Sequence, residues 1–298
     1  MKTKIFIIIA VCIGTIISCQ AMSRVVDVGA QVAGATGVIN QNTAAAISVS
    51  ARAIGSAAEE ITPEQEYYIG RAVAANILTT YRLWKANPAL TAYLNHICAA
   101  IVINSPRPDV FNGYRVAILD TNEINAFATP GGHIFLTRGL INSSTSEDTL
   151  AAVIAHELAH IQLAHGYAII KQSRLNQAFG QAAKDVSGAA GKDFDKITET
   201  FGLSVDVVVT ALLNGYSREQ EFEADSTAMS LLDLSGYEPS SLMDVLRVLE
   251  RNQPGRPGGF NKTHPTPAQR IDNANKTVGN YSVPDTRSYR EVRYRAVR

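Results

Sequence analysis

The sequence predicts an α+β domain that is mostly helical and carries a small β-sheet. β-forming residues are concentrated in two stretches, "YRVAIL" (114–119) and "NAFATPGGHIFLT" (125–137), and the second reads as two strands around a Pro-Gly-Gly turn. After residue 144 the chain reads as helices with few breaks. Because the strands come first and the helices follow, the order favours an α+β domain over a doubly wound sheet.

The composition limits the classes of partner. The 298 residues can build one large domain or two small ones around a substantial core. Lysine and arginine together number 27, and so do aspartate and glutamate, so the formal net charge is zero. Since a chain without an overall positive field does not attract nucleic acid, we expect no nucleic-acid partner.

The N-terminus predicts an export signal, residues 1–18. Lys2 and Lys4 precede an apolar stretch, residues 5–17. This layout of charge followed by apolar residues is typical of a secretory signal peptide. The stretch is shorter than the about 20 apolar residues that an ordinary membrane-spanning helix needs.

The end of this stretch, "IISCQ" (16–20), resembles the lipobox of bacterial lipoproteins. The resemblance implies cleavage before Cys19, attachment of lipid to its thiol, and, because Gln20 is not aspartate, sorting to the outer membrane. We therefore expect a protein that is lipid-anchored to the bacterial outer membrane on its periplasmic side. An ordinary signal peptide with a chance cysteine is the alternative. Cys98 is then the one thiol of the folded part, and we expect it to be a small buried hydrophobe.

Three further segments are expected after the signal. Residues 19–60 are rich in Ala, Gly and Ser, which predicts a loosely helical tether between the anchor and the body. Residues 61–280 form the expected body, and it begins with a capping box of Thr62 and Gln65. Residues 281–298 carry five arginines among the last twelve positions, and we expect a solvated, partly disordered tail rather than a contact with anionic lipid or a partner.

The run "VIAHELAHIQLAH" (153–165) places three histidines and a glutamate among apolar residues. Upstream, Ser144 and Glu147 read as a capping box, which predicts a helix from near Thr145 to Gly166. The histidines of this helix are either satisfied core residues or ligands of a metal ion. Their spacing favours ligands.

His156 and His160 are four residues apart, about 40° from each other and one turn apart on the same helical face. Two imidazoles so placed can bind one ion at about 2.1 Å each. Glu157 lies about 100° around from His156, near the ion without being aimed at it, where it can take a proton from water. A helical His-Glu-x-x-His is the signature of zinc peptidases.

His165 is not expected to be a ligand. It follows His156 by nine residues, which rotates it by about 180° on a continuous helix. We expect it instead to be a cation at the end of the helix, where it meets the helix dipole.

The third ligand must come from another segment, and "NGYSREQEFEAD" (214–225) supplies candidates. Glu221 and Asp225 are four residues apart and share one helical face. Glu219 and Glu223 lie about 200° around from Glu221, so we expect them to be solvated or paired with Arg218. Without the upstream histidines, a helix with this many acids would read as a plain surface.

The two motifs together resemble the gluzincin-type zinc metallopeptidase family that includes HtpX, the CAAX prenyl-protein endopeptidases and BepA. The stretches "ITPEQEYYIGRAVAA", "NAFATPGGHIFLTRGL" and "THPTPAQRI" look like stretches of its exported lipoprotein members, so the resemblance covers about residues 60–275. It implies a zincin-like metalloprotease domain in which Glu221 is a ligand and Asp225 orients a ligand histidine.

The resemblance also implies the chemistry. One Zn²⁺ per chain is held by His156, His160 and Glu221, and Glu157 accepts the proton of the attacking water. His264 stabilises the oxyanion or occupies the open metal position; a structural His-Pro turn is the alternative. Unfolded or extended polypeptides are the expected substrates.

Such a substrate adds a strand to an edge within residues 126–135. By the same resemblance, the cellular role is quality control of misfolded or unassembled envelope proteins, with the envelope assembly machinery as a candidate partner. Two other functions stay open: an assembly factor or chaperone with a latent or structural zinc site, and a scaffold without metal. Glu157 favours the enzyme, because a purely structural site has no use for a base.

Overall fold

The structure is a computed structural model that describes residues 19–186, 209–210, 215–252, 266–281 and 285–297. These residues are mostly helical with one three-stranded sheet, which confirms the predicted α+β class. The chain divides into two compact units, one of Met1–Glu60 with Ile170–Leu203 and one of Ile61–Ile169 with Ser204–Arg298. The expected signal, residues 1–18, lies outside the described residues.

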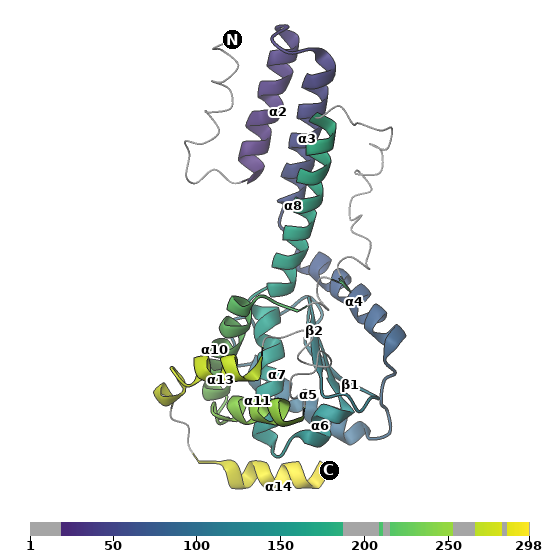
Figure 1. The fold of residues 1–298 in the computed structure, drawn as a ribbon. Helices are drawn as coiled ribbons and strands as arrows, with labels where there is room; N and C mark the ends of the chain where they lie inside the picture. Colours follow the sequence, from purple (N-terminus) through teal and green to yellow (C-terminus); the bar gives the residue numbers. More distant parts are fainter. Residues whose placement is uncertain (1–18, 187–208, 211–214, 253–265, 282–284, 298) are drawn as a thin grey trace. The chain divides into compact units, whose positions relative to one another are not determined.

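In the first unit, α2 (Cys19–Ala35) and α3 (Gln41–Ala57) pack side by side (Figure 1). Their small residues allow a close approach, since a Cβ added to Gly34 would lie 2.6 Å from the Cβ of Ala44. The segment expected to be a loosely helical tether therefore forms a packed pair of helices. Its role as a tether stays a prediction.

The second unit begins with α4 (Pro63–Thr80). The predicted start of this helix is confirmed, because Thr62 and Gln65 form the capping box through both of its hydrogen bonds. Helix α5 (Pro88–Val102) follows and buries one face in the core. Cys98 lies on that face and is buried, as expected.

The two stretches of β-forming residues build the sheet, in the order β1-β3-β2. Strand β1 (Arg115–Leu119) runs parallel to β3 (His133–Thr137), and β2 (Ala126–Thr129) pairs with β3 in an antiparallel hairpin. Gly131 in the hairpin turn has a φ of 75°, and a Cβ there would lie 2.5 Å from the Cα of Tyr67. Glycine is therefore required at this turn.

Helix α7 (Glu147–Gln162) is the central helix of the second unit, and every residue from Glu147 to Ile161 is buried. The predicted capping box is wrong by two residues, since Ser146 and Thr149 form it. The helix also ends before the predicted stop at Gly166. A helix buried on all sides cannot be recognised by an apolar stripe, and local capping signals alone misplaced both of its ends.

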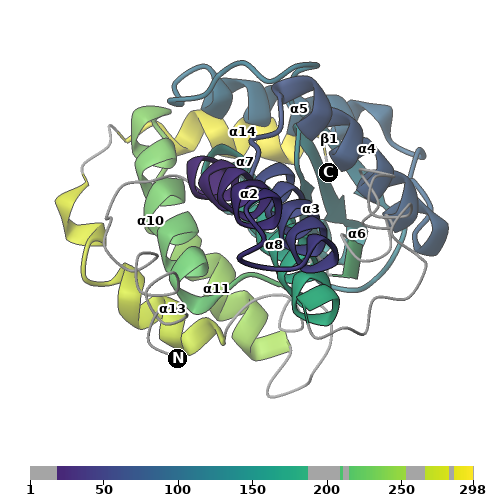
Figure 2. The ribbon, with the colours of Figure 1, turned by 90° about the horizontal axis from the view of Figure 1, so that it is seen from above.

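The remaining described elements are α6 (Arg138–Ser143), α8 (His165–Val186), α10 (Arg218–Leu234), α11 (Ser241–Asn252), α13 (Pro267–Ala274), the 3-10 helix η3 (Val278–Asn280) and α14 (Arg287–Val297). Helices α10, α11 and α13 gather on one side of α7, and α5 and the sheet lie on the other (Figure 2). Among the described residues, no helix combines the length and the apolar character needed to cross a membrane.

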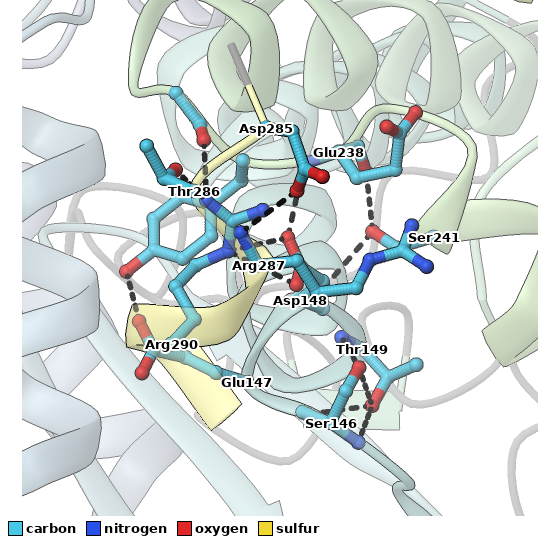
Figure 3. Close-up of polar contacts among 12 residues, drawn as sticks. Ser146, Glu147, Asp148, Thr149, Glu238, Ser241, Asp285, Thr286, Arg287 and Arg290 are labelled. Atoms are coloured by element: carbon cyan, nitrogen blue, oxygen red, sulfur yellow. Dashed lines mark hydrogen bonds and ion pairs between the residues drawn. The ribbon is translucent and has the colours of Figure 1, made fainter. Parts of the chain in front are cut away.

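The basic C-terminal segment differs from its prediction. Instead of a solvated tail, its described residues form α14, which packs against α7 and α5. Arg290 is 5% exposed and its Nε donates to Asp148 of α7 at 3.0 Å (Figure 3). Arg293 donates to the buried carboxylate of Glu147 from Nη2 at 2.5 Å. Two of the arginines thus neutralise the two acids that open α7.

Candidate metal centre

Three side chains from two helices converge in the second unit. His156 and His160 of α7 direct their Nε2 atoms toward each other at 3.1 Å. Glu221 of α10 lies opposite, with Oε2 at 3.5 Å from Nε2 of His156 and Oε1 at 3.5 Å from Nε2 of His160. All three are buried. Among the described residues, these three side chains lie close enough together to hold one metal ion between them.

The separations of these donor atoms fit a tetrahedral ion. Two donors that each lie about 2.1 Å from such an ion are about 3.4 Å apart. The two histidine nitrogens are 3.1 Å apart, and each lies 3.5 Å from one oxygen of Glu221, a different oxygen in each case, so the carboxylate faces both rings at this spacing. Two imidazoles and one carboxylate with an open fourth corner are typical of a catalytic zinc site.

The electrostatics of the cluster also favour a cation. Burial and the charge of Arg270 would lower the pKa of His156, yet the nearby carboxylates of Asp225 and Glu221 outweigh both and raise the pKa to about 9. An ion held between these groups would be stabilised by the same carboxylates.

Asp225 and Arg270 contact the three converging side chains, Asp225 at His156 and Arg270 at both His156 and Glu221. Oδ1 of Asp225 lies 3.1 Å from Nδ1 of His156, and its predicted role of orienting a ligand ring stays a prediction. Arg270 of α13 is 1% exposed and donates to both oxygens of Asp225, at 2.9 Å from Nε and 2.6 Å from Nη2. Its Nη1 also lies 3.3 Å from Oε2 of Glu221.

Arg270 was not predicted to belong to the site. Its one signal was its place in "THPTPAQRI", and nothing in that spacing links it to a helix 45 residues earlier. Burial alone would raise the pKa of Asp225, but Arg270 and His156 lower it, so the carboxyl stays ionised beside the site.

Glu157 follows His156 on α7 and is also buried, at 1% exposed. Its Oε1 has no hydrogen-bond partner among the described residues. Because buried polar atoms are normally paired, this oxygen is available to a water molecule or a substrate group. Burial raises its pKa to about 7, against the opposing charge of His156. A carboxyl group whose pKa lies near neutral pH can both accept and release a proton there, which suits proton transfer.

The comparisons with known proteins agree with this geometry. The sequence profile of Peptidase family M48 matches residues 87–278, which span both helices of the cluster. The chain belongs to Peptidase family M48. This membership confirms the predicted metallopeptidase family. Its exported lipoprotein branch stays a prediction.

Several curated proteins are similar to this M48 chain. It is 28% identical over 198 residues to "Beta-barrel assembly-enhancing protease" of Escherichia coli O157:H7, covering 63% of this chain and 39% of that protein. It is 27% identical over 183 residues to "Mitochondrial metalloendopeptidase OMA1" of Schizosaccharomyces pombe, covering 61% and 51%. It is 28% identical over 150 residues to "Metalloprotease YcaL" of Escherichia coli, covering 50% and 56%. The chain therefore spans less than two thirds of the length of these relatives.

The predicted place of His165 in the M48 chain is wrong. It does not point away from the site, because α7 ends at Gln162 and the backbone turns at Ala164, which has a φ of 55°. This turn brings Nδ1 of His165 to 2.9 Å from Nδ1 of His160. The predicted direction of His165 was wrong because α7 and α8 are two helices and not one continuous helix.

The other predicted residues lie as follows. Glu219 and Glu223 are exposed on α10, in agreement with the prediction that they are not ligands. His264 lies outside the described residues, so its role stays a prediction. Cys19 is the first residue of α2, and its lipidation also stays a prediction.

Proposed function

We propose that the chain is a zinc-dependent endopeptidase in which His156, His160 and Glu221 hold the ion. The convergence of these three donors carries the proposal, and the family supports a metal-dependent hydrolysis of peptide bonds. When bound, the ion supplies the positive charge that activates the attacking water and polarises the scissile carbonyl. Zinc is proposed because the donor set of two imidazoles and one carboxylate is typical of it.

Glu157 is the proposed general base and acid. Its buried carboxylate accepts the proton of the attacking water and passes it to the leaving amine, so the residue ends the reaction as it began. Asp225 holds the ring of His156, and Arg270 holds Asp225. Glu157 thus transfers the proton, while Asp225 and Arg270 hold the surrounding side chains in place.

We propose that substrates bind in extended form along β2. In the described part of the chain, β2 pairs with β3 and with no other strand, so its second edge can accept a peptide by strand addition. Ala128 and Thr129 line the same shallow hollow as His160. Because main-chain pairing tolerates many side chains, this mode suits unfolded polypeptides of varied sequence.

In the cell, we propose a role in quality control of misfolded or unassembled envelope proteins, with the chain anchored through lipid on Cys19 to the outer membrane. The name of the relatives from E. coli, which links a protease to β-barrel assembly, supports this setting. It also supports the second candidate function, an assembly factor whose zinc site is latent.

One experiment tests the enzyme proposal. The metal content of the purified chain is measured, and its cleavage of an unfolded protein is followed with chelator, after zinc is restored, and in Glu157→Gln. We expect one zinc per chain, loss of cleavage with chelator, recovery with zinc, and a Glu157→Gln variant that keeps zinc and does not cleave.

Cleavage that survives both chelation and Glu157→Gln would contradict a zinc-dependent mechanism in which Glu157 is the base. Glu219→Gln is the matched control, because Glu219 is exposed and outside the cluster. Cells that carry Glu157→Gln separate the two candidate functions. Full envelope assembly in those cells would favour the assembly factor.

A further inference from the structure

The second ligand ring has an outer partner of its own. Nδ1 of His160, the nitrogen that faces away from Glu221, lies 2.9 Å from Nδ1 of His165, and this contact is buried. Nε2 of His165 in turn lies 3.4 Å from Oε2 of Glu223, whose side chain is 59% exposed. The three side chains form a line from the cluster to the surface.

The backbone is bent to make this contact. Ala164 adopts a φ of 55°, a left-handed conformation that residues with a Cβ rarely take. The turn at Ala164 separates α7 from α8 and returns His165 to the side of α7 that carries His160. A left-handed residue directly after the C-cap is a common way for a helix to end, and here it sets the direction in which His165 leaves α7.

A second contact restricts the same ring. The ring of Tyr216 stacks on that of His160, with centroids 4.0 Å apart and an angle of 13° between the planes. Stacking fixes the plane of the His160 ring but does not choose which of its nitrogens carries hydrogen. That choice depends on the partner of Nδ1.

The hydrogen positions follow from the contacts. Nε2 of His160 can bind a cation only through its lone pair, so the hydrogen of the neutral ring must be on Nδ1. That hydrogen needs an acceptor, and Nδ1 of His165 is in place to accept it. His165 then carries its own hydrogen on Nε2, where it faces the carboxylate of Glu223.

We propose that His165 is a positioning residue for the metal ligand His160. It accepts the Nδ1 hydrogen of His160 and so holds the tautomer whose Nε2 lone pair faces the ion, as Asp225 does for His156. This inference rests on the proposed metal centre. It assigns two unlike partners to the two ligand rings, a carboxylate for the first and a neutral imidazole for the second.

Two variants of the full chain separate hydrogen bonding from packing. His165→Phe keeps a buried ring but has no acceptor. His165→Asn loses the ring but places an amide oxygen near the position of Nδ1. Zinc affinity is measured at pH 8 by competition with a chromophoric chelator, and the absorption bands of the Co²⁺-loaded proteins report the ligand field. His96→Phe is the control, because His96 is exposed on α5.

We expect His165→Phe to lose about 10- to 100-fold in zinc affinity and to shift the Co²⁺ bands. We expect His165→Asn to stay within about threefold of the wild type, with the bands unshifted. If His165→Phe does not fold, His165→Gln replaces it, since its longer amide misses the Nδ1 position and should bind zinc more weakly than His165→Asn.

Folded variants that all bind zinc like the wild type would overturn the inference and leave the metal centre intact. Equal losses of zinc affinity in His165→Asn and in His165→Phe, or in His165→Gln where it replaces the Phe variant, would also overturn it. The loss would then come from altered packing and not from a missing hydrogen-bond acceptor. A wild-type chain that binds no zinc would overturn the metal centre itself. The measurement on the wild type therefore distinguishes the two failures.

Discussion

Glu221, Asp225 and Arg270 are charged side chains that are each at most 1% exposed. A single charge at such depth costs several kcal/mol, and the three coexist because each faces an opposite charge at hydrogen-bonding distance. The arginine neutralises one carboxylate, which leaves the other for a cation. The site therefore depends on charge balance as much as on ligand geometry.

The first prediction concerns Arg270. Replacing it by Met leaves Asp225 buried without its counter-charge, so we expect the metal-free protein to lose about 3–5 kcal/mol of unfolding free energy in urea. Arg247→Met is the control, since Arg247 forms an exposed ion pair with Asp244, and such pairs contribute about 0–1 kcal/mol. Similar losses in the two variants would contradict the assigned role of Arg270.

The second prediction concerns Cys98. Burial raises the pKa of its thiol to about 12, so almost none of it is ionised at pH 8. We expect iodoacetamide to leave Cys98 unmodified in the native protein and to alkylate it in guanidinium, as peptide mass mapping can show. Equal alkylation rates in both conditions would mean that this face of α5 opens.

Among the elements, α14 has a larger role than its basic composition indicates. The profile of Peptidase family M48 ends at residue 278, before this helix begins. Yet the carboxylate of Glu147 accepts hydrogen bonds from Tyr93, Tyr237 and Arg293, and Arg290 binds Asp148. The helix thus completes the environment of the buried N-terminus of α7, the helix that carries the proposed metal ligands His156 and His160.

The third prediction tests this role of α14. Arg290→Met leaves Asp148 without its buried cation, so we expect the melting temperature to fall by about 10 °C. Arg295→Met, on the same helix, removes an exposed pair with Glu291, and we expect a change within about 2 °C. Equal shifts for the two arginines, measured by circular dichroism, would show that α14 is a peripheral tail.

The elements differ in how well their ends could be predicted. The start of α4 carried a complete capping box and was predicted to the residue, because the box uses neighbours three positions apart. For α7, the sequence predicted a box of Ser144 and Glu147, but Glu147 turns inward to accept from Tyr93, and Ser146 caps the helix with Thr149 instead. A contact with a distant segment thus removed the side chain on which the local signal depended.

At the scale of the molecule, the proposed ion joins helices that lie far apart in the sequence. Its donors come from α7 and α10, and Arg270 adds α13. An ion that binds the folded state and not the unfolded one stabilises the second unit as a whole. We therefore expect a bound ion also to act as a structural link within this unit.

The fourth prediction concerns removal and return of zinc. At a free zinc concentration of about 1,000 times the dissociation constant, we expect the metal-free protein to gain about 4 kcal/mol of unfolding free energy. Glu221→Gln should lose most of this gain, and Glu219→Gln, on the exposed face of the same helix, should keep it. A wild-type melting temperature that zinc does not change would contradict the link.

The sequence by itself determined what depends on residues within one or two helical turns: the shared face of His156 and His160, the acidic face of α10, and the strands. That the two faces meet could be predicted only through the family resemblance, and the tertiary structure alone decided that Arg270 balances the charge and that a turn at Ala164 returns His165 to the site. The physical reason is that the period of a helix is encoded locally. The meeting of distant segments depends instead on burial and charge pairing summed over the whole unit.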